Sequence, residues 1–399
     1  MPGKKNITTV PDAYQGREQA FIKHLLLKSY LEKLVMIVGM SSKTLGITEF
    51  CYVDCFAGPW ADDSENMGGT SIAVSLQILE RCRHALEHRG VKLQFRALYV
   101  EKNQSAFTRL ERYLAEWTPA GVSAKALLGD FVSLREQILN WCGNAPFVFF
   151  FIDPTGWKEV GVDVLKPLLQ RPRSEFLINF MYNDINRTAS MSAWKEDIAA
   201  LLGEEVEPDD LSPGEREKLL LNTYRKNIKL HLNAEGKWLA RSAYVRVLDR
   251  QKERLKYLLI YLTSHPRGII EFMEISEKLD HIQKRVRAST KQSARAEKSG
   301  MDDFFGSDVF VKPEDGHVSQ NEVEQYWLDY LTHEGKRVGE DEFASIIEDT
   351  DWFPGDFQLA LVSLIAANKV RNLNAPKKRP KKPLHWKDGD RLQLTEKNK

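Results

Sequence analysis

Short apolar segments alternate with amphipathic segments between residues 50 and 181, and this alternation limits the possible folds more than any other feature of the sequence. Short apolar segments predict strands, whereas longer segments with apolar side chains at helical spacing predict helices. Strands that alternate with helices form βαβ crossovers, so we expect an α/β fold with a doubly wound, mostly parallel sheet. The expected strands are 50–56, 93–100, 124–128, 147–152 and 175–181, and the expected helices are 18–38, 70–88, 103–117, 132–141 and 160–169.

The 399 residues are enough for two or three folding units. We expect an N-terminal helical segment over 1–45, the α/β domain over 46–282, a linker over 283–317 and a second domain over 318–399. Within the α/β domain, residues 184–240 predict a helical insertion, and 244–248 and 257–263 predict an antiparallel strand pair that closes the sheet. The second domain has helical patterns at 322–331, 341–347 and 356–368, and strand patterns at 369–373 and 391–394. Three helices followed by a hairpin with a basic tip predict a winged-helix-like domain.

Charge is concentrated at one end of the chain. The whole chain has 57 Lys and Arg against 56 Asp and Glu, so its net charge gives no argument for a nucleic-acid or membrane partner. The last 31 residues, however, contain eleven basic and three acidic side chains. This asymmetry favours an anionic partner for the C-terminal domain, although a solvated tail would have the same composition.

The sequence contains neither a long apolar segment nor a metal-binding cysteine pattern. No stretch approaches the ~18 apolar residues that a membrane-spanning helix needs, and the first residues lack the apolar part of a secretory signal. We therefore expect a cytoplasmic protein that does not insert in a membrane. The four cysteines, at 51, 55, 82 and 142, form no CxxC pair. They predict buried, reduced thiols and no metal site.

Four consecutive predicted strands are each followed by an acidic residue: Asp54, Glu101, Asp130 and Asp153. An acidic residue after one strand is commonly only a helix N-cap or a turn former. In a doubly wound sheet, however, ligands bind outside the carboxyl ends of the strands, at the point where the strand order reverses. Four acids in succession therefore predict a ligand site along this edge.

This order of acids is similar to the cofactor pocket of class I S-adenosylmethionine-dependent methyltransferases. The resemblance implies that Asp54 and Gly58 flank the methionine part of S-adenosylmethionine, Glu101 the ribose and Asp130 the adenine. A dinucleotide site would need a G-x-G-x-x-G loop at a helix start, and Gly58 is followed instead by Pro59-Trp60. The residues expected to bind the cofactor are Asp54, Phe56, Ala57, Gly58, Glu101, Asp130 and Phe131.

Longer motifs resemble the three-Cys-motif partner proteins (TcmP). They are Asp54-Cys-Phe-Ala-Gly-Pro59, Asp153-Pro-Thr-Gly156, the segment 179–187, the N-terminal segment 23–30, and Thr263-Ser-His-Pro-Arg-Gly268. The resemblance spans about 24–280. It implies a Rossmann-like methyltransferase sheet and a partner protein with three cysteines that is related to radical S-adenosylmethionine enzymes.

The segment Asp153-Pro154-Thr155-Gly156-Trp157 resembles the Asp-Pro-Phe-Gly loop of some tRNA guanine-N2 methyltransferases. By that resemblance Asp153 orients an attacking nitrogen and Trp157 stacks on a base, so Asp153, Pro154, Thr155 and Trp157 are the expected catalytic residues. The alternative is a strand-ending turn in which Trp157 belongs to the core. A cytosine-C5 methyltransferase is excluded, because no Cys follows a Pro in this sequence.

Basic residues near the expected cleft and on the C-terminal loop are the candidates for nucleic-acid contact. They are Arg187, Lys377, Lys378, Arg379, Lys381 and Lys382. A flexible basic loop can neutralise phosphates without reading sequence, although it can also serve only for solubility. The sequence thus predicts methyl transfer from S-adenosylmethionine to a base of DNA or RNA. The alternative is a non-catalytic, methyltransferase-like partner of the three-Cys protein.

Overall fold

The computed structural model describes residues 10–11, 14, 16–58, 67–234, 236, 238–249, 254–299, 318–375, 379 and 381–395, with backbone alone at 289 and 291–299. The chain divides into two compact units, Met1–Ser264 and His265–Lys399. Each unit is described by itself below. No helix of the described residues is both long and apolar enough to cross a membrane.

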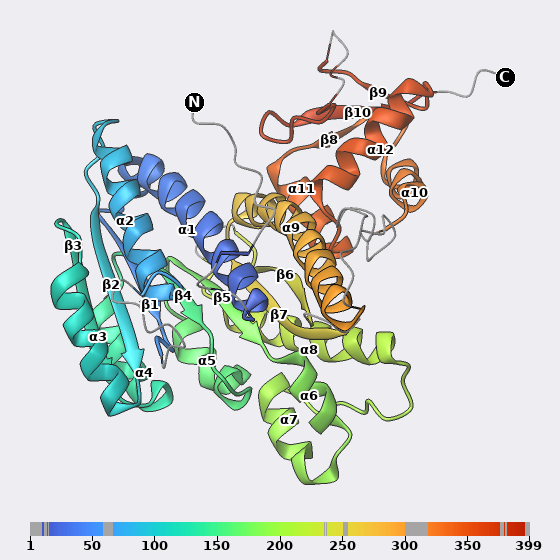
Figure 1. Cartoon of the computed structure of the whole chain (residues 1–399). Helices are drawn as coiled ribbons and strands as arrows, with labels where there is room; N and C mark the ends of the chain where they lie inside the picture. Colours follow the sequence, from blue (N-terminus) through green and yellow to red (C-terminus); the bar gives the residue numbers. More distant parts are fainter. Residues whose placement is uncertain are drawn as a thin grey trace. The chain divides into compact units, whose positions relative to one another are not determined.

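A seven-stranded sheet forms the centre of the first unit, in the order β3-β2-β1-β4-β5-β7-β6 (Figure 1). Strands β3, β2, β1, β4 and β5 are parallel, and β7 runs antiparallel to both β5 and β6. The expected α/β fold with a mostly parallel, doubly wound sheet and a closing antiparallel pair is thus confirmed. The strands are β1 Glu49–Asp54, β2 Gln94–Glu101, β3 Val122–Leu128, β4 Phe147–Ile152, β5 Ser174–Phe180, β6 Arg241–Leu248 and β7 Leu255–Thr263.

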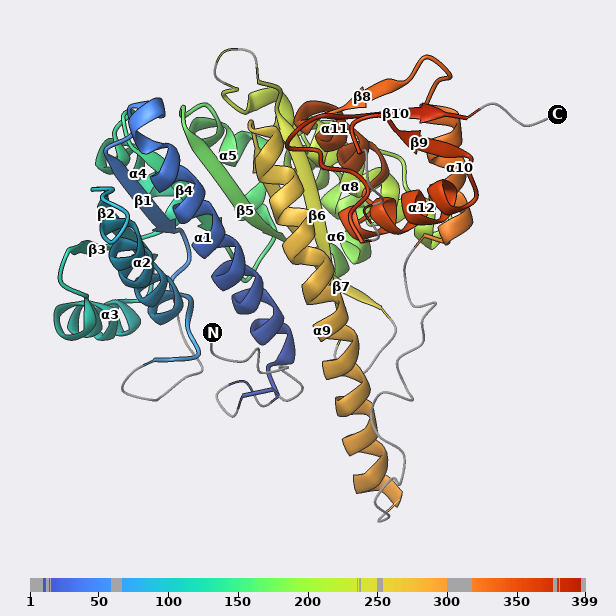
Figure 2. The same cartoon turned by 90° about the horizontal axis from the view of Figure 1, so that it is seen from above.

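Helices cover the sheet on both faces (Figures 1 and 2). Helices α1 and α2 lie side by side on one face, and α4, α5, α7 and α8 pack on the other. The predicted insertion 184–240 consists of α6, α7 and α8. The helices are α1 Glu18–Leu45, α2 Ser71–Glu87, α3 Gln104–Trp117, α4 Phe131–Cys142, α5 Val162–Leu169, α6 Tyr182–Ala189, α7 Lys195–Leu202 and α8 Pro213–His231, with short 3₁₀ turns at η2 Lys158–Val160 and η3 Ser192–Trp194.

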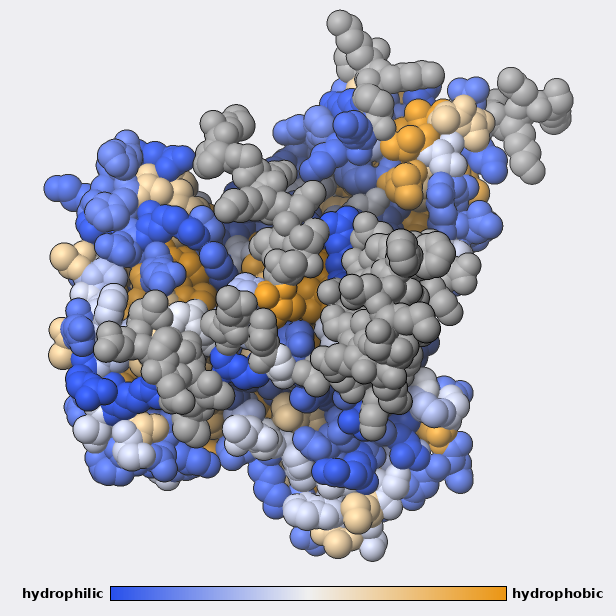
Figure 3. Space-filling view, viewed as in Figure 1, coloured by the Kyte–Doolittle hydropathy of each residue, from blue (hydrophilic) through white to orange (hydrophobic). Residues whose placement is uncertain are grey.

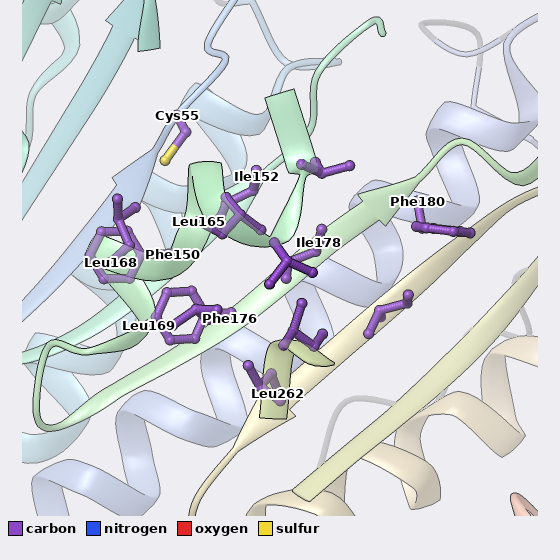
Figure 4. Packing of buried hydrophobic residues seen from close by; sticks show 14 of the residues in the cluster. Cys55, Phe150, Ile152, Leu165, Leu168, Leu169, Phe176, Ile178, Phe180 and Leu262 are labelled. Carbon is purple, nitrogen blue, oxygen red and sulfur yellow. The ribbon is translucent and has the colours of Figure 1, made fainter. Parts of the chain in front are cut away.

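Strand β4 is apolar throughout because both of its faces are covered by helices. Phe150 and Ile152 belong to the cluster under α4, α5 and α8, where Phe150 stacks on Phe176 of β5 with ring centroids 5.0 Å apart. Figure 4 shows this cluster, in which Leu165 and Leu168 of α5 reach the strands. Phe149 points to the other face and lies 6.0 Å from the ring of Tyr30 in α1. The core thus fixes strand register across the centre of the sheet.

A buried polar network holds α1 on the sheet. The Glu175 carboxylate of β5 accepts hydrogen bonds from Tyr30 Oη at 2.8 Å and from Thr263 Oγ1 at 2.8 Å. The hydroxyl of Tyr261 contacts that of Tyr30. Burial raises the pKa of Glu175. Because a buried polar group without a partner is costly, this network gives α1 a defined position, and with it the position of Lys23 one and a half turns from the helix start.

The second unit contains four helices and a small sheet of order β8-β10-β9 among its described residues. Strand β10 pairs antiparallel with both neighbours. The three predicted helices and two predicted strands are present, and β8 is an additional strand. The elements are α9 Pro266–Ser299, α10 Gln320–Tyr330, β8 Lys336–Val338, α11 Glu340–Thr350, α12 Pro354–Ala366, β9 Val370–Asn372 and β10 Asp390–Leu394.

The boundary between the two units differs from the predicted one. The predicted linker 283–317 is helical over 283–299, because α9 continues from Pro266 to Ser299, and residues 300–317 lie outside the described residues. The division falls at Ser264 instead of 282. Residues 283–299 are mostly polar and charged, and this composition is also typical of a linker. The sequence therefore did not reveal that the helix continues through them.

Candidate cofactor and acceptor site

The four acidic residues that follow successive strands lie along one edge of the sheet. Strand β1 lies between β2 and β4, so Asp54 stands between the strand that ends at Glu101 and the strand that precedes Asp153. Asp130 follows β3, which is paired with β2. The reversal of strand order at β1 and β4 is the position where doubly wound sheets bind ligands. The structure thus brings together all four acids predicted from the sequence.

Asp54 is fully buried and fixes the turn after β1. Its carboxylate accepts hydrogen bonds from Ser71 Oγ at 2.6 Å, from the Phe56 N–H at 3.2 Å and from Tyr52 Oη at 3.4 Å. Burial raises the pKa of Asp54 to about 7, against the hydrogen bonds from Ser71 and Phe56, which favour the ionised form. The nearby charge of Asp153 adds to the rise. This carboxyl therefore joins β1 to the start of α2 and titrates near neutral pH.

The titration of Asp54 makes stability depend on pH. Below its folded-state pKa of about 7, native Asp54 holds a proton that the unfolded chain releases, so raising the pH favours the unfolded chain. The stability of wild type relative to Asp54→Asn should fall by about 1.4 kcal/mol per pH unit from about pH 5 to about pH 7, and level off above. Urea unfolding of both proteins at matched pH values measures this difference. A difference that stays constant with pH would contradict the burial of this carboxyl.

The turn after β1 is tied to both neighbouring strands. The N–H of Cys55 donates to Phe151 O at 3.0 Å, and the N–H of Ala57 donates to Val100 O at 2.9 Å. Phe56 packs against Phe131, with ring centroids 5.0 Å apart. Ala57 is buried and Gly58 is half-buried. The predicted cofactor residues of this turn thus occupy a rigid position, and the residues after them, 59–66, lie outside the described part of the chain.

Glu101 and Asp130 differ in how their oxygens are used. Glu101 is 2% exposed, and its Oε1 accepts the Asn103 N–H at 2.5 Å. Among the described residues its Oε2 has no hydrogen-bond partner. Asp130 is the N-cap of α4, because its Oδ1 accepts the N–H groups of Val132 at 2.9 Å and Ser133 at 3.3 Å. Glu101 therefore keeps an acceptor atom for a ligand hydroxyl, whereas the helix start accounts for one oxygen of Asp130.

An apolar side chain that the sequence analysis overlooked lies at the same edge. Leu128, the last residue of β3, is 41% exposed although it is large and apolar. It directly precedes Gly129 and Asp130, which form the turn into α4. An exposed apolar side chain beside acidic acceptors suits a flat ligand with polar edges. Its only sequence signal was its position at a strand end.

Asp153 is held by two side chains that come from distant parts of the sequence. Lys23 Nζ from α1 forms an ion pair with Asp153 Oδ2, with the two side chains 15% and 14% exposed. Asn179 Nδ2 from the end of β5 donates to Asp153 Oδ1 at 2.7 Å. The ring of Tyr257 lies 5.9 Å from the same ammonium. Both carboxylate oxygens of the predicted catalytic residue are thus already paired.

The residues next to this ion pair are also polar. His24 is half-buried, and its pKa falls to about 3 because of desolvation and the adjacent charge of Lys23, so that it is neutral. Its Nδ1 lies 3.0 Å from Tyr14 Oη. Asn179 Oδ1 is buried and has no hydrogen-bond partner among the described residues. An unpaired buried acceptor beside a carboxylate can receive the N–H groups of an amine.

Neither the role of Lys23 nor that of Asn179 was predicted from the sequence. Both residues lie within motifs that resemble the TcmP family, which was the only signal available. Lys23 could equally have faced solvent, since its contact with Asp153 spans 130 residues of sequence. Tertiary packing of α1 alone brings the two together.

The remaining residues of the predicted catalytic loop have mixed surroundings. Pro154 is buried and Thr155 is exposed. Trp157 is half-buried against the core and meets Trp194 of η3 edge to face, with ring centroids 5.8 Å apart. Lys158 Nζ lies 4.8 Å from the Trp194 ring. The two tryptophans form an aromatic surface next to the loop, of which Trp157 alone was predicted.

The predicted nucleic-acid contacts lie in both units. Arg187 on α6 is 72% exposed and forms an ion pair with Asp184 at 3.1 Å. Arg379 donates to the buried carboxylate of Asp390 at 2.6 Å. Lys381 and Lys382 are exposed, whereas Lys377 and Lys378 lie outside the described residues. Arg379 therefore anchors the loop to β10, and the described lysines of this loop face solvent.

The described residues contain no group of three or more His, Cys, Asp or Glu side chains placed to hold a metal ion. The four cysteines are buried and unbridged. Burial raises the pKa of the Cys51 thiol to about 12 and that of Cys142 to about 11. They are therefore protonated, unreactive parts of the core at neutral pH.

No protein-family model matches the sequence, and no curated protein matches it at a significant level. Among solved structures, the chain is similar to LPL1258 of Legionella pneumophila, from family DUF519, at 12% identity and a TM-score of 0.38, over 67% of this chain and 92% of that one. A DUF574 protein of Streptomyces avermitilis has 12% identity and a TM-score of 0.31, over 64% and 93%. Precorrin-6y C5,15-methyltransferase of Geobacter metallireducens has 10% identity and a TM-score of 0.25, over 58% and 85%. At scores and identities this low, the likenesses carry no argument about the activity of this chain.

Proposed function

We propose that the chain is an S-adenosylmethionine-dependent methyltransferase that acts on a nucleic-acid base. The observation that supports this most is the row of Asp54, Glu101, Asp130 and Asp153 at the carboxyl edge of a sheet with the class I methyltransferase strand order. In that fold this edge binds the cofactor, and the turn after β4 faces the methyl acceptor.

The residues of this edge fit S-adenosylmethionine. The unpaired Oε2 of buried Glu101 suits ribose hydroxyls, and exposed Leu128 beside Asp130 suits an adenine ring. The turn Phe56-Ala57-Gly58 and the Asp54 carboxyl suit the methionine part, with Phe131 packed beneath Phe56. The bound cofactor supplies an electrophilic methyl group. The protein's own contribution is to hold donor and acceptor in a reactive orientation.

Asp153 and Asn179 provide the acceptor site in this proposal. An exocyclic amine has two N–H groups, which match a carboxylate oxygen of Asp153 and the unpaired Oδ1 of Asn179. In the structure Lys23 Nζ pairs with the carboxylate of Asp153. In this proposal the acceptor amine replaces the Lys23 ammonium at that carboxylate. Trp157 and Trp194 offer rings on which a base can stack.

The C-terminal unit supplies the proposed nucleic-acid contact. Its element order of helix, short strand, two helices and a hairpin suits a winged-helix-like domain whose wing contains Lys377, Lys378, Arg379, Lys381 and Lys382. Helix α12 contains no Lys or Arg, and its Leu359 is 57% exposed. Figure 3 shows apolar surface in the region where Figure 1 draws α12. Phosphate contact is therefore proposed for the basic loop of this unit and not for α12.

A second candidate function is a non-catalytic partner of a three-Cys-motif protein related to radical S-adenosylmethionine enzymes. The observation that favours it is the Lys23–Asp153 ion pair, which leaves the carboxylate with no free oxygen. The partner itself follows only from the resemblance of the motifs to the TcmP family.

Two measurements test the proposed function. Calorimetric titration of the purified protein with S-adenosylmethionine detects the cofactor site, and transfer of labelled methyl groups to total DNA and RNA detects the activity. Heat together with label in one nucleic acid is the expected result. Heat without label would favour the non-catalytic partner, and no heat would overturn the cofactor site.

A further inference from the structure

The C-terminal unit has a hollow of about 530 Å³ between the turns that flank β8 and β10. Its lining includes Arg337 of β8, Arg391 of β10, and glycines 335 and 389. Lys336, Leu373 and Asn374 complete it, so no carboxylate lines the hollow. A concave surface with cations and without acids is suited to an anion.

The two arginines face each other across paired strands. Arg337 and Arg391 are direct partners in the antiparallel register of β8 and β10. Like charges directly opposite one another destabilise a strand pair. Such a pair is expected where a bound anion compensates the repulsion.

Arg391 is fixed by neutral acceptors. Its Nε donates to Gly335 O at 3.1 Å and its Nη2 to Glu334 O at 3.0 Å. The carbonyl oxygens orient the guanidinium without neutralising its charge. Nη1 has no hydrogen-bond partner among the described residues.

Arg337 is more exposed and lies against a glycine turn. Its side chain is 63% exposed, and Nη1 is 3.7 Å from Glu342 Oε2, an oxygen that also accepts the Gly339 N–H at 2.8 Å. A Cβ at Gly389 would collide with Nη2 of Arg337, and Gly389 has a positive φ of 74°. The lack of a side chain at Gly389 thus leaves room for the Arg337 guanidinium beside the hollow. The positive charge of Arg337 is only weakly compensated by Glu342.

The other charged groups of this region are already occupied. Lys336 Nζ lies 3.4 Å from the centroid of the Tyr330 ring. The Asp390 carboxylate is buried and paired with Arg379. Asp388 is 74% exposed and lies 3.5 Å from His385. Of the three cations that line the hollow, Lys336 is turned to the Tyr330 ring, and Arg337 and Arg391 thus present the guanidinium groups that a ligand can bind.

We propose that this hollow binds a phosphate group of a nucleic-acid backbone through the guanidiniums of Arg337 and Arg391. Planar guanidinium groups bind phosphate oxygens in a bidentate manner, and Asn374 supplies a polar side chain beside them. Exposed Lys381 and Lys382 extend positive charge along the same unit, which suits a polyanion better than a single ion. This inference rests on the proposed nucleic-acid partner and adds to it a fixed phosphate position outside the basic loop 377–382.

The test measures binding of the full chain to a fluorescent DNA duplex of mixed sequence at several salt concentrations. Each phosphate contact contributes about −0.9 to the slope of log affinity against log salt. The double variant Arg337→Gln/Arg391→Gln removes one phosphate contact, so it should flatten the slope by about 0.9 and weaken binding to all sequences alike. Arg371→Gln is the matched control, since Arg371 is exposed on neighbouring β9, bonds Gln393 and does not line the hollow. It should leave the slope unchanged.

Further variants separate this site from folding defects and from the contacts of the basic loop. Arg391→Lys keeps the charge, so it should retain the slope while losing part of the affinity. Lys381→Gln/Lys382→Gln should flatten the slope further when combined with the double variant, because the contacts are distinct. Equal slopes in wild type and in the double variant would overturn the proposal. Direct binding of inorganic phosphate without any duplex binding would also overturn it, in favour of a free anion.

The outcome is independent of the catalytic proposal. If duplex binding did not depend on salt while S-adenosylmethionine still gave heat, the phosphate site would be wrong and the proposed cofactor site would be retained. Normal salt-dependent binding without heat from S-adenosylmethionine would do the reverse.

Discussion

Asp153→Ala is expected to reduce methyl transfer by ~10²–10⁴-fold while leaving the affinity for S-adenosylmethionine within a few-fold. The carboxylate follows β4 and receives hydrogen bonds from Asn179 and Lys23, so its place is fixed before any acceptor binds. Its proposed role is to bind the acceptor amine and not the cofactor. The substitution should therefore affect transfer and leave the cofactor affinity nearly unchanged. Labelled methyl transfer to nucleic acid measures the loss, and calorimetry measures the cofactor affinity.

Controls for Asp153 come from its neighbours. Asp163→Asn changes an exposed carboxylate at the start of α5 and should leave transfer unchanged. Lys23→Met removes the ammonium that pairs with Asp153 but keeps an apolar stem, so it should change the dependence of rate on acceptor concentration more than the cofactor affinity. Equal label in wild type and Asp153→Ala would remove Asp153 from the mechanism. If Asp153→Ala lost both methyl transfer and cofactor affinity, the substitution would instead have disrupted the structure of the site.

The strand ends could be predicted from the sequence because their cause is local. An apolar segment such as Phe147–Ile152 has a defined end, and parallel strands bring their carboxyl ends to one edge. The acid that follows each strand is therefore placed by topology alone. For the same local reason the helix expected from residue 70 begins there, with Thr70 as the N-cap whose side chain accepts the Ala73 N–H.

Contacts that depend on tertiary packing could not be predicted. The partner of Asp153 comes from α1, whose position is set by Tyr30 and its bond to Glu175 in β5. The partner of Arg379 is Asp390, which directly precedes the predicted strand 391–394 and is a buried anchor. Strand β8 has three residues, Lys336–Val338, too few to show an alternating pattern. The two contacts show that Asp153 is paired with Lys23 and that Arg379 is paired with Asp390, which the sequence did not indicate.

Glu101→Ala should weaken binding of S-adenosylmethionine by ~1–3 kcal/mol, about 5- to 150-fold, because it removes the acceptor proposed for the ribose hydroxyls and leaves their donors unpaired. The side chain is 2% exposed, and its Oε1 also accepts the N–H of Asn103, the N-cap of α3. Part of the loss could therefore come from α3.

Glu101→Gln separates these two effects. It keeps an oxygen for the Asn103 N–H and replaces the second oxygen with an amide donor, so it should retain the thermal stability of wild type and lose most of the cofactor affinity. Glu111→Ala on the exposed side of α3 serves as the matched control and should bind like wild type. Calorimetry gives the dissociation constants and thermal unfolding gives the stabilities. Wild-type affinity in Glu101→Gln would place the ribose away from β2, whereas lost affinity at unchanged stability is the pattern that direct contact with the cofactor requires.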